Sequence, residues 1–227
     1  MAKDLTDRTG RSVETLVADL TQPAALAQVE QVLRTDASIT LLVNNAGVGA
    51  AAPLLQAEVG DMDRMITLNV NVLTRLAYAV APAFVARGAG TIVNIASIVA
   101  LAPELLNGVY GGSKAYVLAF SQSLQHELAD KGVRVQAVLP GATATEFWGV
   151  AGVSMDQLPQ GIVMSAQDMV DAALAGLAQG EVVTIPALPD LADWNAYEQS
   201  RKALAPGLSL AVPAARYGLA SPRGVAA

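Results

Sequence analysis

The sequence predicts an α/β fold organised around a doubly wound parallel sheet. Short runs of β-branched and apolar residues recur along the chain, and longer segments with apolar residues at helical spacing separate them. Near-continuous apolar runs are typical of strands that are covered on both faces, as the strands of a parallel sheet are. The predicted strands are residues 13–17, 39–43, 91–96, 133–139 and 181–185, with helices between them.

The predicted helices follow from their start and stop signals. Residues 1–10 read as the last turns of a helix, because Thr9-Gly10 is a typical C-terminal stop. Residues 23–34 place Leu26, Val29 and Leu33 on one apolar face. The other predicted helices cover residues 61–87 with a kink at Pro82, 112–131, 165–179 and 190–205, the last capped by Asp190.

Length and composition indicate one domain over residues 1–227, with residues 206–227 as a C-terminal arm. The chain is 53% hydrophobic, which is enough for one buried core, and no change in composition marks a second domain. The longest apolar stretch, residues 76–86, is interrupted by Pro82 and is too short to span a membrane, so we expect a buried helix.

The charge and the residue types present exclude several classes of function. A net charge of −6 with no basic run argues against nucleic acid and against an anionic membrane surface as partners. The absence of cysteine excludes disulfides and thiol catalysis, and the single His126 has no nearby ligand partner, so no metal site is expected. The first residues lack the apolar segment of an export signal, and a cytoplasmic location is the expectation.

The segment from Ser97 to Lys114 carries the clearest chemical signal. Ser97 directly follows a predicted strand, and ligands bind at the carboxyl ends of strands in open α/β sheets. Tyr110 and Lys114 are four residues apart in a helical pattern, so they project from the same face. A positive charge at ~4 Å is worth ~4 kcal/mol at an effective dielectric of ~20, which would bring the pKa of the phenol down towards neutrality. The alternative is an ordinary solvated helix face, so the surrounding motifs must decide.

Three further features give this segment its context. Ser97 precedes Tyr110 by thirteen residues, Asn44-Asn45-Ala46-Gly47 closes an earlier strand, and Pro140-Gly141 closes a later one. From Val13 to Val183 the chain resembles the short-chain dehydrogenase/reductase (SDR) family, whose members are NAD(P)-dependent oxidoreductases with a Rossmann-like fold. The resemblance implies hydride transfer between NAD or NADP and a carbonyl or alcohol substrate.

The resemblance assigns a role to each of four catalytic positions. Tyr110 gives the proton to the carbonyl oxygen, Lys114 lowers the pKa of Tyr110 and holds the nicotinamide ribose, and Ser97 hydrogen-bonds the carbonyl. Asn69 matches the position of an asparagine that anchors a water in the proton relay, although a lone helical asparagine is usually incidental. The substrate is expected to be a small, apolar carbonyl or alcohol compound.

The cofactor positions follow the same resemblance. Asp19 and Leu20 would contact the adenine end, although Asp19 is equally suited to capping a turn. The remaining expected contacts are Asn45, Ala46 and Gly47 at the adenosine and ribose, Tyr110 and Lys114 at the nicotinamide ribose, and Pro140, Gly141, Thr143 and Thr145 at the nicotinamide and phosphate. Thr145 fits the threonine position of the last loop best and Thr143 second.

Two segments are expected to lie beside the active site. Residues 146–164 are apolar with several glycines and read as a mobile lid, the alternative being a subunit-contact loop. Family members pair the helix that carries Tyr110 with its copy in another subunit, so a homodimer or homotetramer is expected, with Phe120, Leu124 and the helix of Asn69 at the contact.

One family motif is not found in these 227 residues. The family begins with a strand that enters a glycine-rich turn, whose amides hold the cofactor pyrophosphate, and no GxxxGxG pattern occurs here. The expectation is therefore a shortened chain that lacks the first β-α-β unit, from a start codon placed too far downstream. Residues 13–17 would then pair directly with 39–43 or leave the sheet. The residue that selects NAD or NADP would also be missing.

Two alternatives to an SDR oxidoreductase remain. A non-catalytic scaffold or sensor is favoured by the missing glycine-rich turn, but all four catalytic positions are filled. Non-redox chemistry such as dehalogenation is disfavoured because Lys114 is retained where such relatives carry arginine.

Overall fold

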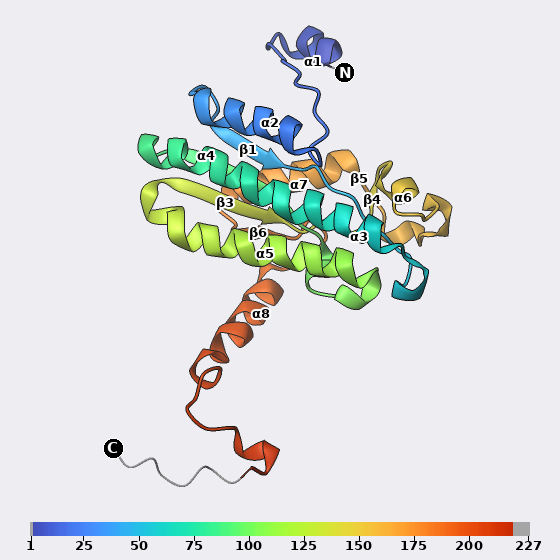
Figure 1. The fold of residues 1–227 in the computed structure, drawn as a ribbon, viewed down its shortest axis with the longest axis vertical. Coiled ribbons are helices and arrows are strands. Elements are labelled where there is room, and N and C mark those ends of the chain that lie inside the picture. Colours follow the sequence, from blue (N-terminus) through green and yellow to red (C-terminus); the bar gives the residue numbers. More distant parts are fainter. Residues whose placement is uncertain (1, 220–227) are drawn as a thin grey trace. The chain divides into compact units, whose positions relative to one another are not determined.

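The computed structural model describes residues 2–219 of the chain, which divide into two compact units with the boundary between Ala187 and Leu188. The first unit is the α/β domain (Figure 1). Its sheet consists of four parallel strands, in the order β1 (Leu41–Asn44), β2 (Gly90–Ile95), β3 (Val133–Val138) and β6 (Val183–Thr184). All four carboxyl ends therefore lie at one edge of the sheet, where an open parallel sheet binds its ligands.

Helices cover both faces of this sheet. On one face, α2 (Pro23–Thr35), α4 (Leu73–Arg87) and α5 (Gly108–Leu128) form the larger core with Leu42, Ile92 and Val135 (Figure 1). On the other face, α7 (Ala166–Gln179) packs Ala173 and Met169 against Val93 and Val138. Neighbouring strand residues such as Ile92 and Val93 thus serve opposite cores, which explains the nearly continuous apolar runs.

The remaining elements are short or lie at the ends. They are α1 (Ala2–Thr9), α3 (Val59–Ile66), α6 (Phe147–Val150), and the two-stranded parallel pair β4 (Thr143–Ala144) and β5 (Met164–Ser165). In the second unit, α8 (Leu191–Ala203) is capped by Asp190, whose Oδ1 accepts a hydrogen bond from the Ala192 amide at 2.8 Å, as predicted. The predicted C-terminal arm begins in this unit, and its residues 220–227 lie outside the described part of the chain.

The predicted strand at residues 13–17 is wrong. These residues form no strand, and Val17 is 95% exposed. A strand needs a neighbour for its backbone hydrogen bonds, and within residues 2–219 the strand β1 pairs only with β2. Leu41 and Val43 of β1 are also exposed, so this side of the sheet presents an unpaired, apolar edge. Of the two outcomes expected for residues 13–17, the structure has the segment outside the sheet.

The predicted helix over residues 61–87 is longer than expected and irregular at a different place. Helical structure runs without a break from Val59 to Arg87, and residues Thr67–Val72 form a stretch of π-helix between α3 and α4. The expected irregularity was at Pro82, which lies within α4. By length and composition this run is the one candidate for a membrane span within residues 2–219. Val80 and Phe84 are fully buried in the larger core, however, which is typical of a core helix in a globular domain.

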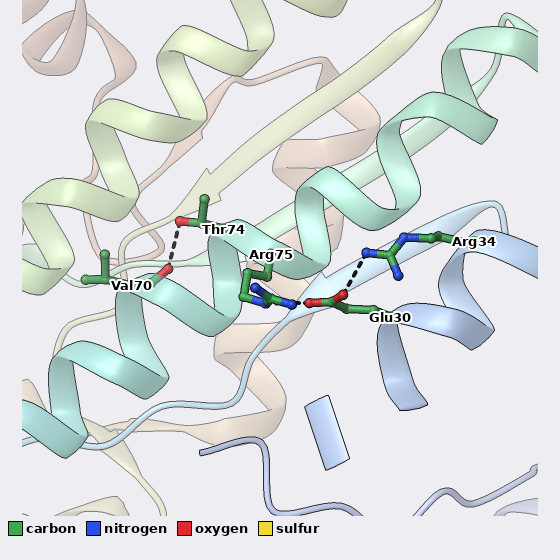
Figure 2. Close-up of polar contacts among 5 residues, drawn as sticks. All are labelled: Glu30, Arg34, Val70, Thr74 and Arg75. Carbon is green, nitrogen blue, oxygen red and sulfur yellow. Dashed lines mark hydrogen bonds and ion pairs between the residues drawn. The ribbon is translucent and has the colours of Figure 1, made fainter. Parts of the chain in front are cut away.

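Polar contacts tie the helices of the larger core together. Glu30 on α2 accepts a hydrogen bond from Arg34 Nη2 at 2.6 Å and another from Arg75 Nε on α4 (Figure 2). Burial would raise the pKa of the Glu30 carboxyl, but the two guanidinium partners hold this pKa below its ordinary value. Thr74, next to Arg75, donates to the Val70 carbonyl at 2.8 Å and lies 2.7 Å from the Tyr116 hydroxyl on α5. These contacts fix α2, α4 and α5 relative to one another.

The expected subunit face on α5 needs a correction. Leu124 is buried in the core of its own chain, so it is not available at a surface. An aromatic group lies nearby instead, in which Phe120 is stacked between Tyr78 and Tyr116, with ring centroids 6.5 Å and 5.5 Å apart. Tyr78 is 68% exposed.

Candidate active site

The structure brings Ser97, Tyr110 and Lys114 together at the carboxyl edge of the sheet. Ser97 follows β2, and its hydroxyl interacts with the Tyr110 phenol. Lys114 lies one turn after Tyr110 on α5, with its Nζ 5.9 Å from the centroid of the Tyr110 ring. All three side chains are buried. A hydroxyl, a phenol and an amine therefore meet where the family places its proton-transfer groups.

The electrostatics differ from the expectation for Tyr110. Burial raises the pKa of the Tyr110 phenol above its ordinary value, and the hydrogen bond with Ser97 opposes this only in part. Burial also lowers the pKa of the Lys114 amine to about 8. Lys114 Nζ donates to the carbonyl oxygen of Ile95 at 2.8 Å, away from the phenol. The pKa of the phenol is therefore not brought towards neutrality, because desolvation outweighs the hydrogen bond with Ser97.

Asn69 lies in the π-helical stretch and is buried. Its Oδ1 accepts from the Val48 amide at 3.0 Å, and its Nδ2 donates to the Val48 carbonyl at 2.8 Å. This side chain thus completes the backbone hydrogen bonding of the loop after β1, as a strand neighbour would. Stretches of π-helix are frequent at functional sites, since the wider turn redirects side chains.

Two polar residues of the site were missed by the sequence reasoning. Ser113 is buried between Asn69 and Tyr110, accepting from Asn69 Nδ2 at 3.1 Å and donating to the Tyr110 carbonyl at 2.8 Å. Asn107 caps α5 through the Val109 amide, at 2.8 Å, and donates to the Ala52 carbonyl at 2.6 Å. An asparagine just before the helix was a readable capping signal, whereas Ser113 carried no local signal.

The loop after β1 approaches the amine and amide groups closely. A Cβ added at Gly47 would lie 3.0 Å from Asn69 Oδ1 and 3.5 Å from Lys114 Nζ. Gly47 therefore keeps the loop backbone against these polar groups. Asn45 and Ala46 are exposed beside it, at the mouth of this arrangement.

The loop after β3 lies directly against Ser97. The Pro140 carbonyl accepts from the Ile98 amide at 3.0 Å and from Ser97 Oγ at 3.4 Å. Thr143 belongs to β4, and its carbonyl accepts from Trp148 Nε1 at 2.9 Å. Thr145 is exposed, and its hydroxyl accepts from the Phe147 amide at 3.3 Å. Of the two candidate threonines, Thr145 has the more accessible side chain.

Asp19 and Leu20 lie in the turn before α2. Asp19 Oδ1 accepts from the Thr21 amide at 3.0 Å and the Thr21 hydroxyl at 2.7 Å, and these bonds lower the pKa of its carboxyl. This is the turn-capping role that the sequence left open as an alternative. Leu20 packs against the larger core. A role for either residue at the adenine stays a prediction.

The donors at this edge fit the nicotinamide and ribose end of a dinucleotide. The Lys114 amine supplies protons for ribose hydroxyls, and the close approach of Gly47 leaves a backbone surface with no side chain in the way. Tyr110 packs in an apolar cluster with the buried Met65 and Val99, and the partly buried residues Val48, Met62, Leu106 and Phe147 lie against this cluster. Apolar side chains around a proton donor suit an apolar substrate.

Comparison with known proteins identifies the family. Residues 1–152 match the sequence profile of the short chain dehydrogenase family. The chain belongs to this family of NAD(P)-dependent oxidoreductases. A 3-oxoacyl-acyl-carrier-protein reductase of Salmonella typhimurium is 30% identical over 187 residues, which are 79% of this chain and 76% of the reductase. An NADPH-dependent 1-acyldihydroxyacetone phosphate reductase of Schizosaccharomyces pombe is 34% identical over 61% of this chain, and the match spans only 47% of that enzyme.

Two solved structures are more similar still. A short-chain dehydrogenase from Sphingobium yanoikuyae in complex with NADPH is 49% identical, with a TM-score of 0.92 over 95% of this chain and 84% of that one. A bulky-bulky ketone specific alcohol dehydrogenase from Comamonas testosteroni is 44% identical, with a TM-score of 0.86 over 95% of this chain and 82% of that one. The Rossmann-like parallel sheet predicted from the sequence is thereby confirmed.

Proposed function

We propose that this chain is an NADP(H)-dependent reductase of ketones with apolar substituents, and in the reverse direction an alcohol dehydrogenase. The observation that carries the proposal is that three buried side chains lie close together at the carboxyl edge of the sheet, namely Tyr110, Ser97 and Lys114. The Sphingobium structure supports NADPH as the cofactor, and the Comamonas enzyme supports a ketone as the substrate.

The proposed mechanism assigns each side chain one task. When bound, the nicotinamide supplies the hydride. Tyr110 keeps its proton at neutral pH, because burial raises the pKa of its phenol, and delivers it to the carbonyl oxygen as that oxygen becomes an alkoxide. Ser97 donates a hydrogen bond to the same oxygen. Lys114 in its protonated form stabilises the phenolate left on Tyr110, and Asn69 holds the neighbouring loop and the relay water of the family.

The test is turnover of NADPH with a panel of ketones. We expect oxidation of NADPH with aryl alkyl or diaryl ketones, and little with charged carbonyl compounds such as 2-oxo acids, because the side chains packed around Tyr110 are apolar. Faster reduction of 2-oxo acids than of aryl ketones would contradict the substrate class. The absence of any turnover in a chain that binds NADPH would contradict the enzyme.

We further propose that the first β-α-β unit of the family, with its glycine-rich turn, is not encoded in residues 1–227. The unpaired edge of β1 and the exposed segment 13–17 support this proposal, since the family's first strands would pair there.

Fusing the first β-α-β unit of the Sphingobium enzyme before residue 1 tests this proposal. NADPH affinity, measured by calorimetry, is expected to rise by at least about tenfold in the fusion, since amides at a helix N-terminus bind the pyrophosphate. Equal affinity with and without the added unit would show that residues 1–227 provide a phosphate site of their own. Tight binding without turnover in the fusion would favour the scaffold.

We also propose that the aromatic group Tyr78, Tyr116 and Phe120 is a contact between subunits. Tyr78 is exposed, Tyr116 and Phe120 beside it are half-buried, and Tyr78 lines one hollow with the Glu30–Arg75 ion pair. An aromatic group next to charged side chains is typical of protein interfaces. Sedimentation is expected to show a dimer or tetramer, and Tyr78→Asp is expected to weaken the association between subunits. A monomer at micromolar concentration would contradict the proposal.

A further inference from the structure

Phe147, in the segment predicted to be a lid, reaches across to the loop after β1 and meets the backbone at Gly49. A Cβ added at Gly49 would overlap the Phe147 ring, with Cζ and Cε2 the nearest atoms. The same ring also lies against Tyr110, with ring centroids 5.7 Å apart and an interplanar angle of 43°. The Phe147 ring therefore lies against both the backbone at Gly49 and the ring of Tyr110, the proposed proton donor.

Position 49 is a glycine because a side chain there would collide with the Phe147 ring, and not because its backbone conformation requires glycine. Within residues 2–219 the glycines with positive φ are Gly10, Gly88, Gly132, Gly152, Gly180 and Gly218, and Gly49 is not one of them. An alanine could therefore adopt the backbone conformation of Gly49 without strain. The nearest atoms to the added methyl group all belong to the Phe147 ring, so the absence of a side chain serves to admit that ring.

The base of the lid is anchored independently of Phe147. The strands β4 and β5 pair Thr143 with Met164 and so join the two ends of residues 145–163. The Ala51 amide also donates to the Ala151 carbonyl at 3.2 Å, which links the loop after β1 to the lid a second time. With both ends held in this way, rotation of one side chain can open the space beside Tyr110 without unfolding the lid.

We infer that Phe147, seated on Gly49, determines the size of substrate that reaches Tyr110. This inference rests on the proposed function and specifies its substrate class. A carbonyl oxygen that receives the Tyr110 proton must lie within hydrogen-bond distance of the phenol, so its substituents lie beside the Phe147 ring. The Phe147 ring then limits the size of one of the two substituents of a ketone. Removal of this ring makes room for a second bulky substituent.

The test is a double-mutant cycle on Gly49→Ala and Phe147→Ala, with ketone binding as the main measurement. Dissociation constants of an aryl methyl ketone and a diaryl ketone are measured with oxidised NADP⁺ present, which cannot reduce the ketone, so no turnover occurs during the measurement. Phe147→Ala is expected to favour the diaryl ketone by about tenfold, in line with the effect of shape changes in apolar sites. Gly49→Ala is expected to change the ratio of the two constants at least about threefold when Phe147 is present, and less than twofold when it is absent.

Trp148 gives a second measurement that is independent of any ligand. Its ring lies 5.4 Å from that of Phe147 in an edge-on arrangement, and it is buried. In a Trp194→Phe background, Gly49→Ala is expected to shift the emission of Trp148 to longer wavelength only when Phe147 is present. Gly60→Ala is the matched control, because a Cβ there meets nothing within 4 Å.

The outcomes separate this inference from the proposed function. Additive effects of the two substitutions, in binding or in emission, would overturn the contact between Phe147 and Gly49 as a determinant. An unchanged ratio of dissociation constants in Phe147→Ala would overturn its role in size selection. Failure of the parent to oxidise NADPH with any ketone, while the ratio shifts as expected, would overturn the proposed redox function alone.

Discussion

Replacing Tyr110 by phenylalanine is expected to lower kcat/KM for ketone reduction by roughly 10²- to 10⁴-fold, the usual contribution of a general acid. The substitution deletes one hydroxyl and leaves the ring that packs against Met65, Val99 and Phe147. Ser97 keeps its contacts with the Pro140 carbonyl and the Val99 amide, so no buried donor is left without a partner. The fold should therefore survive, with a loss of about 0.5–1.5 kcal/mol in the free energy of unfolding.

Tyr116→Phe is the matched control for this experiment. Tyr116 lies on the same helix, and its hydroxyl also has one side-chain partner, Thr74 Oγ1, at 2.7 Å. Its removal should cost a similar amount of stability and leave kcat/KM within about threefold of the parent, because general acid catalysis needs contact with the reacting oxygen. Activity of Tyr110→Phe within tenfold of the parent, or equal losses in the two variants, would contradict the assignment of Tyr110.

The sequence predicted the elements whose causes are local. Four of the five proposed strands occur within a few residues of their predicted positions, because each is an apolar run that is buried by helices on both faces. The helix stop at Gly10 was predicted as well, and this glycine has a positive φ that other residues avoid. The four proposed catalytic residues were found through their spacing and the family resemblance, and the structure brings them to one edge.

What the sequence did not predict depends on partners far along the chain. Residues 13–17 have the composition of a strand, but a strand forms only beside another strand. The π-helical stretch around Asn69 accompanies bonds to the backbone of Val48, which no local pattern reveals. The same holds for Phe147, whose seat at Gly49 is visible only after the lid and the loop after β1 meet. The raised pKa of Tyr110 likewise required the burial of the site to be known.

Lys114 is expected to make ketone reduction dependent on pH in a predictable direction. The pKa of its amine is lowered to about 8, so Lys114 is positively charged below that pH and neutral above it. At 5.9 Å from the Tyr110 ring, a unit charge stabilises the phenolate by about 3 kcal/mol at an effective dielectric of ~20, or roughly 100-fold in rate. The value of kcat/KM should therefore be constant below about pH 7 and fall as the pH rises through 8.

Two variants of Lys114 separate charge from other contributions. Lys114→Met removes the charge at every pH and should give a low rate, about 100-fold below the parent at pH 7, with no fall near pH 8. Lys114→Arg keeps the charge over the whole range, so it should also lose the fall near pH 8, at a rate set by how well the larger guanidinium fits beside the Ile95 carbonyl.

The lowered pKa of Lys114 also predicts that the free energy of unfolding rises over the pH range in which kcat/KM falls. The lysine has a pKa of 10.5 when unfolded and about 8 when folded, so between these values the unfolded chain binds more protons. The free energy of unfolding should therefore rise from pH 8 to pH 10.5, because the folded chain no longer bears the cost of burying the Lys114 charge. Over the same range the rate of ketone reduction is expected to fall. Thermal unfolding of the parent and of Lys114→Met across this range tests the linkage, because only the parent should show the rise. A parent whose rate is level to pH 9 and whose stability matches that of Lys114→Met throughout would show that Lys114 does not carry the charge that the mechanism requires.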